Sequence, residues 1–522
     1  MTNGDNMSLL NKVKSKWWIE ILSLALISAL IYLVNINQFT YFRDDWYYAY
    51  DGYIAGPSIF KVMFNSDRPA RGLFFGIYYL LFGPQPLPYH IGAYVWRLLG
   101  AYSALWLFHL LWPRQRVANF SMALLFLIYP GFLWWPQGIE YQPMIASVCL
   151  YTFSIALTLA AIKSKHKITQ VFLWAGSILT GLTAIALVDY AIGMEAFRIF
   201  CIFLLIASTQ RSLSFSRKVS LTIRASLIPL TIPLIFIIWK IFIFKGDRKA
   251  TDISFQLSGL IHAPKETISL WGERLYTSTL NVSFLAWWTP LKQHYSYLQQ
   301  KDILPGFLIA MIAIALFLLT LHFITDSNPD TQTQAGFKSD SNLPSTAIWL
   351  GLAGVIFSLL PVIMANRFVI FKAYSHYALP ASLAAVILVI GLIHSLPYRK
   401  IQLILMSLLI GVSALTHRAL AIKVTNEQET IRNFWWQVYW RIPKIEEGTT
   451  LAVYYPNLHY GEDTDIVWGP ANFLYYLQLQ PEVERVKYKL AGTKLDKTGI
   501  QNVIEENVVV KNPPLDIELI RL

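Results

Sequence analysis

The chain has 522 residues, of which 55% are hydrophobic and only 14% are charged, and its mean hydropathy is +0.44. This composition is typical of a polytopic membrane protein. The net charge of +12 does not indicate nucleic-acid binding, because Lys and Arg occur mainly in short clusters between apolar runs. Cys149 and Cys201 both lie inside apolar runs, which excludes a disulfide framework and a cysteine-based metal site.

Apolar windows of about 20 residues predict the membrane spans. The first follows Lys12, Lys14 and Lys16 without a small-residue cleavage signal, so we expect a retained span rather than a signal peptide. The run 72–83 is too short to cross unaided, and we expect a re-entrant or interfacial helix there. The eleven predicted spans lie near 17–36, 89–112, 117–135, 141–162, 168–188, 192–209, 219–244, 303–324, 346–365, 379–397 and 400–418.

The distribution of basic residues predicts the topology. Cytoplasmic loops carry an excess of Lys and Arg, and with eleven spans the main basic clusters all fall on one side. These clusters lie at 12–16, 114–116, 163–167, 211–218 and 399–400. The polar stretch 325–345 is then a flexible cytoplasmic linker. The outer side receives 37–71, the turns at Glu140 and Asp189, the loop 245–302, the segment 366–378 and everything after about 419.

We therefore expect an all-α polytopic membrane domain over residues 1–420 and a small extracytoplasmic α/β domain over 421–522. The Trp- and Tyr-rich loop 245–302 predicts amphipathic helices on the membrane. In the tail, strand-like runs at 450–455 and 507–511 flank a helix expected at 471–479. A multi-pass protein of a bacterial inner membrane is the expected setting.

The outer loop after the first span is unusually rich in charge. Charged groups beside a span are costly to keep dry and unnecessary for packing, so this loop predicts a wet reaction centre at the membrane surface. Neighbouring residues point about 100° apart on a helix, so one of Asp44 and Asp45 can face a substrate while the other faces the scaffold. A solvated helix N-cap is the alternative. The loop contains Asp44, Asp45, Asp51, Asp67, Arg68 and Arg71.

These residues resemble those of a known family. An acidic pair after a first span is followed by an Arg-Pro element, a short helix and a second span. The sequence thus resembles the GT-C superfamily of integral-membrane glycosyltransferases, which includes protein O-mannosyltransferases and lipid A aminoarabinose transferases. The layout of roughly residues 15–420 is similar. The matching motifs are Asp44-Asp45, Ser66-Asp67-Arg68-Pro69, Leu81-Phe82-Gly83-Pro84 and Tyr89-His90.

The resemblance implies transfer of a sugar from a polyprenyl-phosphate carrier to an acceptor on the extracytoplasmic side, with inversion at the anomeric carbon. Asp44-Asp45 replaces the Asp-Glu of protein O-mannosyltransferases, so the acceptor can be a glycan, a lipid or a protein. An acceptor hydroxyl needs a carboxylate base within about 3 Å, and we assign this role to Asp44. Asp45 would orient Asp44, position the acceptor or bind a divalent metal such as Mg²⁺ or Mn²⁺.

The donor implied by the resemblance has a phosphate and a sugar, and we expect different residues to bind each of them. Cations, preferably Arg, must hold the leaving phosphate, although an Arg at the membrane boundary can instead reach lipid headgroups. Carboxylates at the outer ends of spans can bind sugar hydroxyls or simply favour a helix N-terminus. The candidate substrate-binding residues are Asp67, Arg68, Arg71, Glu140, Asp189, Arg367, Lys372 and His376.

Two other classes of function remain open: a transporter or flippase of lipid-linked saccharides, and a non-catalytic protein of polysaccharide assembly. Transporters place ionisable residues in mid-span, whereas charges here cluster at one membrane face, which favours chemistry at the surface. Glu195 and Arg198 lie about one turn apart on the sixth span and could simply pair with each other. The sequence contains no HExxH, GxSxG, Walker or GxGxxG motif in the right context, which agrees with a lipid-linked donor.

Overall fold

The computed structural model describes residues 17–244, 253–325, 343–455, 464–481, 483 and 485–494. Most of the predicted linker 325–345 and the predicted strand 507–511 lie outside these residues. The chain forms two compact units. Unit 1 comprises Met1–Val34, Tyr94–Leu133 and Met144–Leu420, and unit 2 comprises Asn35–Ala93, Trp134–Pro143 and Ala421–Leu522.

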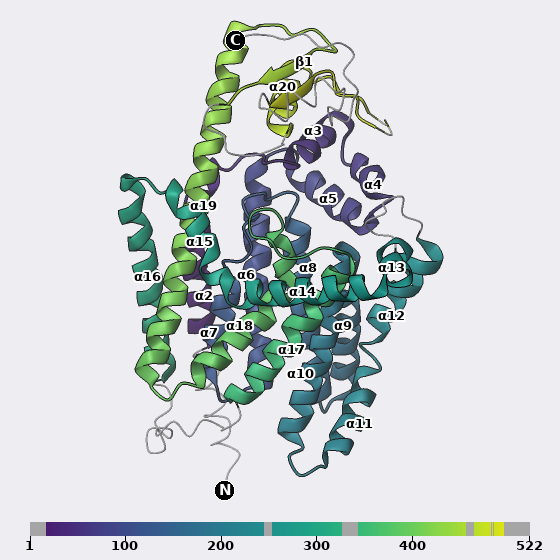
Figure 1. Cartoon of the computed structure of the whole chain (residues 1–522), viewed down its shortest axis with the longest axis vertical. Helices are drawn as coiled ribbons and strands as arrows, with labels where there is room; N and C mark the ends of the chain where they lie inside the picture. The colour runs from purple at the N-terminus through teal and green to yellow at the C-terminus, as the bar shows by residue number, and fades with distance from the viewer. Residues whose placement is uncertain are drawn as a thin grey trace. The chain divides into compact units, whose positions relative to one another are not determined.

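Eight helices of the described residues are long and apolar enough to cross a membrane. The number is nine if the pair α11 (Phe215–Ser226) and α12 with η3 (Thr231–Ile243), bent by 49°, is one span. Together with two shorter apolar helices, α2 (Trp17–Tyr32) and α7 (Arg116–Leu127), every predicted span coincides with an apolar helix (Figure 1). The eight are α6 (Pro86–Leu111), α8 (Gln142–Lys163), α9 (Lys167–Leu187), η2 with α10 (Asp189–Thr209), α16 (Gln300–Thr325), α17 (Leu343–Met364), η8 with α18 (Ser375–His394) and α19 (Arg399–Arg441).

Helix α18 lies at the centre of unit 1. It is apolar on all sides and nearly all of its residues are buried, as expected for a helix surrounded by other helices. Its closest neighbour is α17, which packs along it (Figure 1). A Cβ atom on Gly351 would lie 2.4 Å from the backbone nitrogen of Leu388, so only glycine permits this approach. Small residues at such contacts let membrane helices gain van der Waals packing.

The loop 245–302 is helical where it is described. It contains α13 (Ile253–His262), α14 (Pro264–Ser283) and α15 (Thr289–His294). Helix α14 holds the segment 366–371 of unit 1. Arg274 donates to the carbonyl of Asn366 (3.1 Å), and Asn281 Nδ2 donates to the carbonyl of Val369 (2.9 Å).

Unit 2 combines the first outer loop with the tail. The loop forms α3 (Asp45–Ala55), α4 (Ile59–Phe64) and α5 (Pro69–Phe82), and the short run 72–83 lies in α5 up to Phe82, with Gly83 at its C-cap. The tail forms β1 (Thr450–Val453), α20 (Asp465–Tyr475) and β2 (Ala491–Lys494). The two strands are parallel, from Thr450 opposite Ala491 to Val453 opposite Lys494, with α20 in the connection.

Helix α20 begins six residues before the predicted helix 471–479 and ends four residues earlier. A proline inside a helix leaves the carbonyl of residue i−4 without its donor, so a helix start after Pro470 was the natural prediction. In the structure the carbonyl of Ile466 accepts hydrogen bonds from Tyr455 Oη (2.9 Å) and Trp435 Nε1 (3.2 Å). These side chains replace the lost backbone bond, and the helix continues through Pro470.

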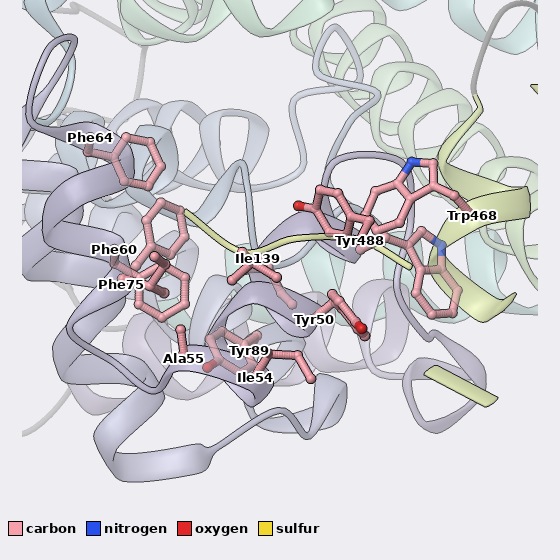
Figure 2. Close-up of a cluster of buried hydrophobic side chains, with 13 residues drawn as sticks. Tyr50, Ile54, Ala55, Phe60, Phe64, Phe75, Tyr89, Ile139, Trp468 and Tyr488 are labelled. Carbon is pink, nitrogen blue, oxygen red and sulfur yellow. The ribbon is translucent and has the colours of Figure 1, made fainter. Parts of the chain in front are cut away.

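An aromatic cluster forms the core of unit 2. Phe60 and Phe75 lie at one end of it and Trp468 and Tyr488 at the other, with Ile139 between them (Figure 2). The cluster therefore unites α3 to α5, the segment 134–143 and the tail in one apolar core. Because Ile139 is buried there, the position of the next residue, Glu140, is restricted.

The contact of α17 with α18 yields a stability prediction. We expect Gly351→Ala to lower the free energy of unfolding by about 1–3 kcal/mol, because the added methyl group forces two backbones apart. Gly272→Ala is the matched control, since Gly272 lies within α14 with nothing near its Cβ position, and it should raise stability by up to about 1 kcal/mol. Thermal unfolding of the purified variants measures both effects. Equal melting temperatures for the two variants would contradict this account.

Candidate active site

Asp45 ties two segments of unit 2 together. Its side chain is fully buried at the first residue of α3. Oδ2 accepts a hydrogen bond from the backbone N–H of Phe42 (3.3 Å), and Oδ1 accepts one from the backbone N–H of Glu140 (2.9 Å). Burial raises the pKa of Asp45 well above its usual value, while these N–H groups oppose the rise. With both oxygens engaged by backbone, Asp45 faces the scaffold.

Asp44 lies at the N-cap position of α3 but makes no capping hydrogen bond with its side chain. Its partly exposed carboxylate instead forms a hydrogen bond with Glu140. Burial, the charge of Asp44 and this hydrogen bond raise the pKa of Glu140 well above its usual value. A raised pKa favours the protonated form of Glu140, in which its carboxyl group can donate a hydrogen bond to Asp44. Gln137 Nε2 donates to Glu140 Oε2 (2.5 Å).

Tyr48 and Arg71 complete the surroundings of this carboxyl pair. Arg71 is buried on α5, and its charge partly opposes the rise in the pKa of Glu140. Tyr48 lies one turn after Asp44, with its ring stacked on Phe75 at 4.8 Å. Burial and the charges of Glu140 and Asp44 raise the pKa of Tyr48, so it remains a neutral phenol. Tyr48 was not among the predicted residues, although its spacing of four from Asp44 on a helix could have indicated it.

Residues of the tail also contact the side chains of α3. Tyr47 forms a hydrogen bond with Asp465, and its ring centroid lies 4.5 Å from that of Trp468. Trp468 Nε1 donates to Asp465 Oδ1 (3.0 Å). Asp51, further along α3, accepts a hydrogen bond from Tyr488 Oη (2.5 Å). Nothing in the local sequence indicated that tail residues would support the acidic pair.

The other candidate residues of unit 2 pair with each other. Arg68 Nη1 lies 3.6 Å from Asp67 Oδ2, and both side chains are partly exposed. Each charge already has a neighbour of opposite sign. The contacts of Asp67 and Arg68 with a substrate therefore stay a prediction.

Four candidates belong to unit 1. Asp189 lies 4.0 Å from Lys240 Nζ, Arg367 is partly exposed and Lys372 is exposed. His376 is buried, with its ring centroid 4.1 Å from that of Tyr377. The structure thus brings Asp44, Asp45, Glu140 and Arg71 together in one unit and places these four in the other.

The residues do not fit a metal ion at the acidic pair. The described part of the chain contains no group of three or more His, Cys, Asp or Glu side chains arranged to hold one. Asp45 uses both oxygens for backbone hydrogen bonds, and Asp44 is hydrogen-bonded to Glu140. We therefore assign no catalytic step to a metal.

The solved structures to which the chain is similar include the following three. The first is the oligosaccharyltransferase of Archaeoglobus fulgidus with Zn and sulfate (12% identity, TM-score 0.41, 88% of this chain and 62% of that one). The second is ArnT from Cupriavidus metallidurans in the apo state (13% identity, TM-score 0.33, 97% of this chain and 90% of that one). The third is AglB, an oligosaccharyltransferase of A. fulgidus in complex with an inhibitory peptide and a dolichol-phosphate (15% identity, TM-score 0.39, 91% of this chain and 61% of that one).

This chain spans about three fifths of the length of the two archaeal structures. No protein-family model matches the chain, and no curated protein matches it. The functional argument below therefore starts from the residues of unit 2.

The raised pKa of Glu140 predicts how stability depends on pH. The folded state holds the proton of Glu140 more tightly than the unfolded state, so stability should fall as pH rises from 4.5, the ordinary value, towards the raised pKa. One such proton changes the unfolding free energy by at most about 1.4 kcal/mol per pH unit. Glu140→Gln should flatten this dependence in thermal unfolding, whereas Glu429→Gln, at an exposed position of α19, should leave it unchanged. An identical slope in wild type and Glu140→Gln would refute the assignment.

Proposed function

We propose that the protein is an integral-membrane glycosyltransferase that uses a polyprenyl-phosphate-linked sugar and inverts the anomeric centre. The observation that carries the proposal is the division of roles at the acidic pair. Asp45 is buried and bound to backbone, whereas Asp44 is partly exposed and hydrogen-bonded to Glu140. One accessible carboxylate on a rigid support suits a general base.

In the proposed reaction, the Asp44 carboxylate takes the proton from an acceptor hydroxyl. The acceptor oxygen attacks the anomeric carbon, and the bond from that carbon to the phosphate oxygen breaks. The electron pair leaves with the lipid phosphate, and the proton remains on Asp44. The raised pKa of Glu140 favours its neutral form, which would hold Asp44 in position without placing a second negative charge beside it.

The proposed base also has an aromatic and cationic setting. Tyr48 supplies a neutral hydroxyl next to the carboxyl pair, and Arg71 supplies a positive charge. A buried cation near the reaction centre offsets the negative charge that develops on a leaving phosphate. Arg367 and Lys372 of unit 1 are further proposed phosphate ligands, and Asp189 and His376 proposed sugar contacts.

The charge pattern of the loops favours an extracytoplasmic site. A lipid-linked donor is consistent with this location, because a polyprenyl chain remains in the bilayer while its phosphate stays at the surface. A glycan, a lipid or a protein remains the proposed acceptor.

Turnover by Asp44→Asn tests the proposal. A positioned base contributes roughly 10²–10⁴-fold to the rate, so we expect a loss of that size with little change in donor affinity. The assay follows consumption of a panel of polyprenyl-phosphate sugars by purified protein, with and without EDTA. Glu429→Gln is the control for removal of an acidic charge and should retain wild-type turnover. If Asp44→Asn turns over a donor as fast as wild type, Asp44 is not the base.

A further inference from the structure

A second feature of unit 2 is the exposed side of the last turns of α19. Three tryptophans occur there, and Trp435 is buried in the apolar core beside β1 and α20. Trp436 and Trp440, in contrast, are 63% and 67% exposed. Single exposed apolar residues are common, but two indoles one turn apart present a large apolar area that a merely solvated helix does not need.

The exposed side combines three kinds of side chain. The buried residues Ile431, Trp435 and Val438 occupy the opposite side of the helix. On the exposed side, two arginines supply positive charge, two amides supply hydrogen-bond donors and acceptors, and two indoles supply flat apolar rings. These residues, named here the α19 face, are Arg432, Asn433, Trp436, Gln437, Trp440 and Arg441.

The polar side chains of the α19 face are available to a ligand. Among the described residues, no ion pair includes Arg432 or Arg441, and no side-chain hydrogen bond includes Asn433 or Gln437. The two indoles contact each other, with ring centroids 5.7 Å apart and planes at 72°. The face thus presents two cations and no carboxylate of its own.

Lipid and a second copy of the chain fit the α19 face poorly. Trp436 follows the predicted span 400–418 by 18 residues, which is about 27 Å of helix. The polar region on each side of a bilayer is only about 5–8 Å thick. Two copies related by a two-fold axis through this face would bring their arginines together, and like charges repel.

We propose that the α19 face binds a glycan chain that carries carboxylates. The C–H faces of pyranose rings pack on indoles, neighbouring sugar hydroxyls match the donor and acceptor of an amide side chain, and a carboxylate matches a guanidinium. An acidic peptide would satisfy the arginines without supplying sugar rings or hydroxyls. The proposal goes beyond the proposed function, because binding at this face needs neither a lipid-linked donor nor Asp44.

Equilibrium binding of a fluorescently labelled hexasaccharide of uronic acid to the full chain in phosphatidylcholine nanodiscs tests the proposal. Wild type should bind it, and Trp436→Ala and Trp440→Ala should each bind about tenfold more weakly, because each loses an aromatic contact. Trp288→Ala is the matched control. Trp288 is also 63% exposed but belongs to unit 1, so this variant should retain the wild-type affinity.

The arginines test the charge of the ligand separately. Arg432→Gln and Arg441→Gln should each weaken binding of the hexauronate about 2–5-fold, the effect of losing an exposed ion pair, and added salt should reduce the difference. The corresponding Lys variants keep the charge and should lose less. A neutral hexasaccharide of glucose should bind wild type more weakly than the hexauronate does, and the Gln variants should bind it as wild type does.

Competition distinguishes a glycan from an acidic peptide. Unlabelled hexauronate should displace the label at far lower concentration than hexaglutamate. Displacement by hexaglutamate at the same concentration would mean that the face selects charge alone and would overturn the proposal. Absence of binding to wild type, or equal affinity of wild type and Trp436→Ala, would also overturn it.

Two further measurements keep the result decisive. The melting temperature of each variant identifies misfolding, which is not expected because the replaced side chains are exposed. Consumption of lipid-linked sugars is measured on the same samples. If the hexauronate binds through the two tryptophans and no donor is consumed, the glycan-binding face stands and the proposed function fails. Consumption of a donor without hexauronate binding refutes only the face.

Discussion

The proposed reaction centre depends on one buried carboxylate. Asp45 accepts backbone hydrogen bonds from Phe42 and Glu140, residues that are far apart in the chain. An unsatisfied carboxylate in this position would be costly, so the two bonds hold the start of α3 and the segment 134–143 together. This contact brings the side chain of Glu140 to Asp44. The proposed base therefore owes its position to a neighbour that does not itself face the substrate.

The aromatic core of unit 2 supports the same geometry from the other side. Ile139 is buried beside Phe75 and Tyr89 in that core, so the backbone that carries Glu140 has little freedom. Trp468 and Tyr488 of the tail pack against α3. A catalytic group needs such support, because a displacement of about 1 Å can cost a hundredfold in rate. The tail is thus a structural part of the proposed site.

Two arginines in the apolar helices of unit 1, the buried Arg198 and the half-buried Arg97, have different surroundings. Arg198 has Glu195, Thr158 and Ser177 as partners across three helices, which is the arrangement expected of a charge that serves packing. Arg97 has ring faces and one phenol but no counter-charge among the described residues.

The sequence by itself determined the apolar helices, the strand β1 and the pairing of Glu195 with Arg198, because hydrophobic runs and a spacing of one helical turn act locally. It also indicated that Asp44 and Asp45 would divide their roles. Only the tertiary structure decided which carboxylate is buried, that Glu140 meets Asp44, and that Tyr455 and Trp435 permit a helix through Pro470. These contacts join segments distant in the chain, so they follow from packing and from the need to satisfy buried polar groups, which no local pattern records.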